Sequence, residues 1–85
     1  MPNWMFTVKF SPWYRDDTLS IEEKGKRAAA ELRKLAANKR AVHIEDDLLL
    51  LAENFESVSS VEDFDDFMEA LYDIGDLARI WVATI

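Results

Sequence analysis

The chain has 85 residues, a formal net charge of −7 and a hydrophobic content of 49%. This length suits one domain spanning residues 1–85, and so apolar a chain is not a disordered acidic tail. No apolar run approaches the ~20 residues that a membrane-spanning helix needs. The acidic balance argues against direct binding of nucleic acid or an anionic membrane, because Lys and Arg make the phosphate contacts. The absence of cysteine excludes disulfides, thiolate metal ligands and a cysteine nucleophile.

The first predicted element is a strand over residues 3–10 with one buried face. Apolar side chains recur there with the period of two that a strand requires, at Trp4, Phe6, Val8 and Phe10. Proline has no N–H to give to a sheet, so Pro12 ends the strand and residues 13–18 form a loop.

An aromatic pair, Trp13 and Tyr14, lies in this loop beside Arg15. Aromatic and arginine side chains are typical anchors of protein interfaces, which makes Trp13 and Tyr14 candidate partner-binding residues. The alternative is that both rings fold back over the sheet or over a helix end.

Two amphipathic helices are predicted next. The first covers residues 20–38 and starts at a capping box formed by Ser20 and Glu23. The second covers about residues 45–57 and has acidic residues in its first turn, where the helix dipole favours them. The segment 39–44 between them fits either a short strand or an extended link.

A third amphipathic helix starts at another capping box, Ser59 with Glu62, and ends near Asp76. Residues 79–85 are rich in β-branched and aromatic side chains and are predicted to form a closing strand. The order β-α-α-α-β predicts an α+β fold, in which the two terminal strands form a two-stranded sheet packed against three helices.

Trp4 and Trp81 are expected to lie in or near the core of this fold. The relative direction of the two strands stays open, because the segment 39–44 has no assigned path. An exposed strand edge would also allow a homodimer through a continuous sheet.

The charges are unevenly divided along the chain. Residues 1–40 hold nine basic and five acidic residues, a net +4, whereas residues 41–85 hold Arg79 against twelve acidic residues, a net −11. Such asymmetry indicates a partner surface or a pairing of the two halves.

Much of this negative charge lies on one side of the third predicted helix. At 100° per residue from Phe64, six carboxylates fall between about 100° and 200°, opposite the apolar stripe. They are Glu62, Asp65, Asp66, Glu69, Asp73 and Asp76. No Lys or Arg shares that helix, so we interpret this sector as a candidate surface for a basic protein; a solvated helix face is the alternative. Acids of the second helix would widen it: Glu45, Asp46, Asp47, Glu53 and Glu56.

Residues able to carry chemistry are sparse. The single histidine, His43, precedes a run of acids, which admits a metal or acid–base site, but a surface histidine is the simpler interpretation. Two glycines cannot build a phosphate-cradling loop. We therefore expect no enzyme, no cofactor and no metal.

Short patterns near the two ends of the chain suggest a context. They are Trp4-x-Phe-Thr-Val8 at the start and Phe64, Leu71-Tyr-Asp73, Asp76 and Arg79-x-Trp-Val82 towards the end. In these patterns the chain resembles a group of small uncharacterised proteins from bacteriophage and prophage genomes. The resemblance implies a mobile-element protein made in a bacterial cytoplasm, and it transfers no functional residue. Small acidic proteins of that setting are often similar to anti-CRISPR-type inhibitors, which bind host defence complexes.

Together these observations predict a non-enzymatic inhibitor that binds a basic protein surface. The partner expected is a host nucleic-acid-binding complex, engaged by charge mimicry of nucleic acid. The alternative is a structural or assembly adaptor that dimerises through a sheet edge.

Overall fold

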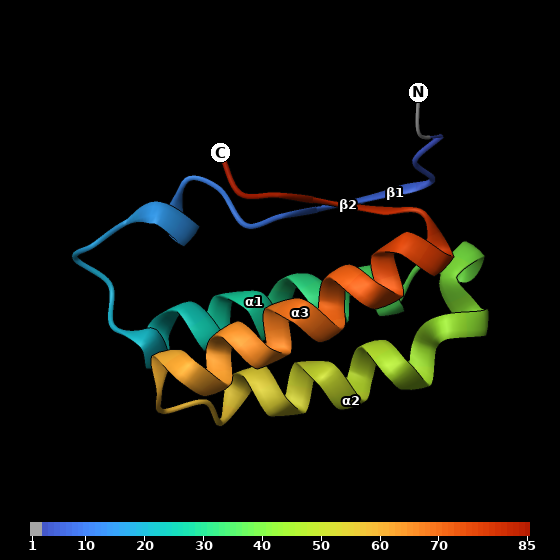
Figure 1. Ribbon diagram of the computed structural model, residues 1–85. Coiled ribbons are helices and arrows are strands. Elements are labelled where there is room, and N and C mark those ends of the chain that lie inside the picture. The colour runs from blue at the N-terminus through green and yellow to red at the C-terminus, as the bar shows by residue number, and fades with distance from the viewer. Residues whose placement is uncertain (1–2) are drawn as a thin grey trace.

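The computed structural model describes residues 3–85; residues 1–2, which the expected single domain includes, lie outside this part. The elements follow the predicted β-α-α-α-β order of a small α+β fold (Figure 1). In chain order they are β1 (Phe6–Lys9), the 3-10 helix η1 (Trp13–Arg15), α1 (Ile21–Ala36), the 3-10 helix η2 (Lys39–Ile44), α2 (Glu45–Glu56), α3 (Val61–Ala78) and β2 (Ile80–Ala83). Both strands are shorter than predicted, because only four residues of each are paired.

The two strands run parallel, with Phe6 opposite Ile80 and Lys9 opposite Ala83. Parallel strands need a crossover of a dozen or more residues, and the three helices supply it. Each helix runs back along its predecessor, so three passes return the chain to the end of the molecule where β1 began (Figure 1). β2 therefore starts beside the start of β1 and runs the same way.

The sheet lies on one side of α1 and α3, and α2 lies on the other side (Figure 1). β1 packs on α1, and β2 packs on α3. Side chains alternate along each strand, and those that face the helices are buried: Phe6, Val8, Ile80 and Val82. Phe55 of α2 is fully buried and makes edge-on aromatic contacts that join the layers, with Phe10, Phe64 and Phe67.

Serine caps begin two of the helices. The Ser20 hydroxyl accepts a hydrogen bond from the Glu23 N–H at 3.1 Å, as the capping box predicts. At α3 the cap is Ser60, whose hydroxyl accepts from the Asp63 N–H at 3.1 Å, so the assignment of Ser59 was wrong. Both serines precede an acidic residue by three positions, and only the folded backbone distinguishes them.

The segment between α1 and α2 is neither a strand nor an extended link. Residues 39–44 form η2, which begins where the Asn38 side chain accepts a hydrogen bond from the Arg40 N–H at 2.9 Å. Ala41 is fully buried there. These tight turns reverse the chain within a few residues, which an extended segment would not do.

Trp4 and Trp81 do not lie in the core, which corrects the prediction. β1 begins only at Phe6, so Trp4 precedes the paired residues. Trp81 alternates with the buried Ile80 and Val82 and therefore points to the open face of the sheet. The two indole rings lie 5.5 Å apart between centroids and remain 39% and 49% exposed.

Candidate protein-binding surface

The six carboxylates predicted to share one side of the third helix all lie on α3 and are all exposed. We call this set (Glu62, Asp65, Asp66, Glu69, Asp73 and Asp76) the acidic ridge. The opposite side of α3 carries the buried residues Phe64, Met68 and Leu71, which fix the orientation of the helix. At ~1.5 Å per residue the ridge is about 21 Å long.

None of the ridge carboxylates takes part in an ion pair within residues 3–85. The ion pairs of this part of the chain lie elsewhere, at Arg27–Glu23, Arg33–Glu56 and Lys34–Glu31. Like charges four residues apart, such as Asp65 and Glu69, cost a helix ~0.2–0.5 kcal/mol per pair. The ridge is therefore a source of negative potential that the protein leaves uncompensated.

The acids of α2 do not extend the ridge as a block. Glu56 pairs with Arg33 of α1, and this hydrogen bond holds the pKa of the Glu56 carboxyl below its ordinary value. One of the five carboxylates is thus used inside the molecule. The other four take part in no ion pair of residues 3–85, so the surface of α2 stays acidic as well.

Trp13 is buried, which corrects its assignment as an exposed anchor. Its ring lies 4.8 Å from that of Phe10 between centroids, and 8% of the residue is exposed. The η1 turn places Trp13 inward, so the interpretation that it folds back over the core is the correct one.

Tyr14 lies beside the ridge. Its ring is half-buried and tilted against Phe64, 6.1 Å between centroids. Burial raises the pKa of the Tyr14 phenol, and the nearby Tyr72 and Asp65 raise it further. A cleft of about 210 Å³ is lined by Tyr14, Asp65 and Lys24, and the Lys24 ammonium donates a hydrogen bond to the Tyr14 carbonyl oxygen at 2.9 Å. The structure thus brings one of the two predicted aromatic residues next to the N-terminal half of the ridge.

A second groove, of about 250 Å³, lies between α3 and β2. We call it the β2 groove; it is lined by Tyr72, Trp81, Val82, Ala83, Thr84 and Ile85. Sequence reasoning missed it. The available signal was Tyr72, a large aromatic side chain at about 80° from Phe64, on the edge of the apolar stripe.

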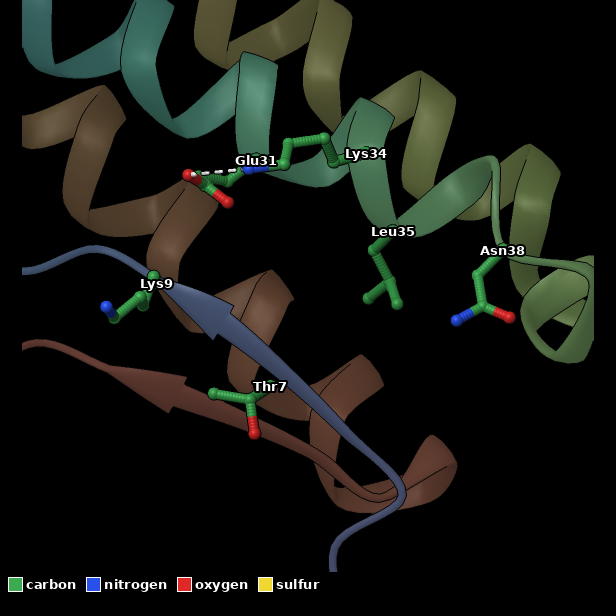
Figure 2. Close-up of a pocket in the computed structure, with 6 residues that line it drawn as sticks. All are labelled: Thr7, Lys9, Glu31, Lys34, Leu35 and Asn38. Carbon is green, nitrogen blue, oxygen red and sulfur yellow. Dashed lines mark ion pairs between the residues drawn. The ribbon is translucent and has the colours of Figure 1, made fainter.

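A third groove, of about 370 Å³, lies between β1 and α1, on the opposite edge of the sheet. We call it the β1 groove; it is lined by Thr7, Lys9, Glu31, Lys34, Leu35 and Asn38. Figure 2 shows Leu35 extending from α1 towards β1, and the ion pair of Glu31 with Lys34 above it. Two of the lining side chains are cationic, so this groove differs in charge from the α3 side of the molecule.

His43 lies exposed in η2, outside these grooves. The described residues contain no group of three or more His, Cys, Asp or Glu side chains placed to hold a metal ion. Among the helices of residues 3–85, none combines the length and apolar character that crossing a bilayer requires.

No protein-family model, curated protein sequence or solved structure matches this chain.

Proposed function

We propose that this chain is a non-enzymatic protein that binds a basic surface of another protein through the acidic ridge. The observation that carries the proposal is the set of six exposed carboxylates on one side of α3, none of them paired within residues 3–85. An uncompensated, one-signed surface attracts a partner of opposite charge and accelerates the encounter.

The form of binding that we propose is mimicry of a nucleic-acid backbone. Carboxylates three or four residues apart on a helix lie about 5–6 Å apart, so the ridge offers a line of regularly spaced negative charges. A groove lined by Lys and Arg that accepts phosphates would accept this line of charges as well. The partner is then a nucleic-acid-binding protein, and nucleic acid competes with the ridge for it.

The biological role that we propose is inhibition of a host defence complex that binds nucleic acid, in the manner of anti-CRISPR proteins. This part of the proposal is supported by the resemblance of the chain ends to bacteriophage and prophage proteins. The charge of α3 supports the basic partner, whatever pathway that partner serves.

The proposal is tested by reversing charge on the ridge. The double variant Glu69→Lys and Asp73→Lys is compared with a matched double variant of exposed acids outside α2 and α3, Asp17→Lys and Glu22→Lys. Both variants change the net charge equally. Immobilised wild-type chain first captures its partner from nuclease-treated bacterial lysate, and mass spectrometry identifies it.

The affinity of each variant for the captured partner is then measured across salt concentration. We expect the ridge variant to bind at least about tenfold more weakly at low salt and with a flatter salt dependence. The matched variant should bind nearly as the wild type does, and nucleic acid should displace both. Equal affinities of the ridge variant and the wild type would refute the proposal.

A second candidate function is an assembly adaptor that dimerises through the sheet. It is favoured by one observation: with two strands in the sheet, β1 and β2 each have an edge that no other strand of residues 3–85 covers. Light scattering that gives a strict monomer at high concentration would exclude it.

A further inference from the structure

In the two-stranded sheet, β2 has an edge that faces away from β1. The Arg79 and Ala83 carbonyl oxygens accept hydrogen bonds from β1, at 3.1 Å from the Phe6 N–H and 2.7 Å from the Phe10 N–H. Backbone groups of successive strand residues point to opposite sides, so the N–H and C=O of Val82 point away from β1. An unpaired N–H and C=O at a strand edge are a template for another strand.

The helix α3 covers only the first part of this edge. A Cβ atom on Gly75 would lie 2.8 Å from the Ile80 carbonyl oxygen, so helix and strand are in close contact there. Beyond this contact the β2 groove opens beside Val82. The edge is thus open at Val82, whereas the Thr84 carbonyl oxygen beyond it accepts a hydrogen bond from Arg15 Nε at 3.1 Å.

The walls of the β2 groove are apolar. Tyr72 lines the groove from α3, and Trp81 and Ile85 line it from the C-terminal segment. These three side chains are 45%, 49% and 91% exposed. A segment seated here would bury aromatic and aliphatic surface that is now in water.

The charge beside the groove specifies the occupant. Tyr72 lies at about 80° around α3, and the nearest ridge carboxylates are Asp65, Asp76 and Glu69 at about 100°, 120° and 140°. Glu69 and Asp76 are also its neighbours three and four residues away. By this spacing the carboxylates flank the groove on its α3 side and attract Lys or Arg side chains of an occupant there, while Arg15 lies at Thr84, where it donates to the carbonyl oxygen.

The groove at the opposite edge of the sheet has a net positive lining, because Glu31 pairs with Lys34 and Lys9 has no acid beside it among the lining residues. The β1 groove carries Lys9 and Lys34 among its lining residues (Figure 2). A basic segment is disfavoured there, although β1 also has an outward edge at Thr7. The two edges therefore differ both in charge and in the apolar lining that only the β2 groove offers.

We propose that a basic, extended segment of the partner docks in the β2 groove and pairs with β2 as a third strand. Backbone hydrogen bonds at Val82 hold the segment, Tyr72 and Ile85 cover its apolar side chains, and ridge carboxylates receive its Lys or Arg side chains. This inference rests on the proposed function, because it names the form in which the basic partner reaches the ridge.

The probe is an acetylated and amidated hexapeptide of alternating valine and lysine, with the valine–glutamate hexapeptide as its matched control. Nuclear magnetic resonance of the full chain follows amide shifts and amide hydrogen exchange. We expect the basic peptide alone to bind and to slow the exchange of the Val82 amide at least about tenfold. The Thr7 amide on the opposite edge should keep its rate.

A groove variant, Tyr72→Ala with Ile85→Ala, keeps all six ridge carboxylates and changes only exposed side chains. We expect it to bind the basic peptide at least about tenfold more weakly than the wild type. Its affinity for the captured partner should fall as well.

Several outcomes would overturn the inference. Shifts at the ridge without protection of Val82 would mean that charge alone binds the peptide, and the proposed function would stand without the added strand. The same conclusion follows if the captured partner no longer binds the ridge variant but binds the groove variant as tightly as the wild type. The inference is also refuted if the peptide protects the Thr7 amide from exchange or if the basic peptide does not bind. It is refuted as well if protection of Val82 grows with protein concentration when no peptide is present.

Discussion

Replacing Gly25 with alanine should destabilise the protein, although alanine is the better helix former. Gly25 is buried on α1, where the end of α2 crosses it. A Cβ atom at this position would overlap the Phe55 carbonyl oxygen and the Val58 Cγ1 atom. The first of these belongs to the backbone, which cannot rotate out of the way as a side chain can.

The expected magnitude follows from two opposing terms. In a helix interior, alanine is favoured over glycine by about 1 kcal/mol. Forcing a methyl group into a packed contact costs about 1–3 kcal/mol, and a backbone neighbour places Gly25 at the upper end. The net change is a loss of roughly 2 kcal/mol, or a fall in Tm of about 8–16 °C for a domain of this size.

Urea unfolding followed by tryptophan fluorescence, together with a thermal scan by circular dichroism, measures this change. Ala30→Gly is the matched control, because Ala30 is exposed on the same helix and should lose about 1 kcal/mol through propensity alone. A Gly25→Ala protein as stable as the wild type, or more stable, would refute the close approach of α1 and α2 at this position.

Two further predictions concern a helix cap and an ion pair. Ser60→Ala should lower the free energy of unfolding by about 1 kcal/mol because α3 loses its cap, while Ser59→Ala should change it by less than about 0.5 kcal/mol. Equal effects in urea unfolding would contradict the position of the cap. The Arg33 hydrogen bond lowers the pKa of Glu56 from its ordinary 4.5, so the ionised carboxylate stabilises the fold above pH 4.5, and this contribution is lost as pH falls through the folded-state pKa. Glu56→Gln should therefore be less stable than the wild type at neutral pH, by a margin that narrows below pH 4.5; a margin independent of pH would argue against the pairing.

The candidate site divides into a predictable and an unpredictable part. The acidic ridge follows from spacing within one helix, since 100° per residue places Asp65, Glu69 and Asp76 on the same side whatever the helix packs on. The grooves do not follow from spacing. Tyr72 and Val82 are brought together only because β2 packs on α3, and the sequence pattern does not predict that contact.

Buried or exposed aromatic residues illustrate the same division. The sequence admits Trp13 either as a partner-binding residue or as folded back, and it predicts Trp81 in or near the core; in the structure Trp13 is buried and Trp81 is exposed. The η1 turn directs Trp13 into the core, whereas the alternation of β2 directs Trp81 to the open face. The aromatic residue type favours burial of both side chains, and the direction of the backbone decides which of them is buried.

By itself, the sequence determined the kind and order of the elements and the one-signed face of α3, because these depend on periodicity and on charges a few residues apart. Only the tertiary structure decided the parallel direction of the strands, the turn at residues 39–44 and the use of Glu56 by Arg33. Each of these depends on where a helix returns to and on contacts between residues far apart in the chain. Local patterns carry no information about such contacts until the helices are packed.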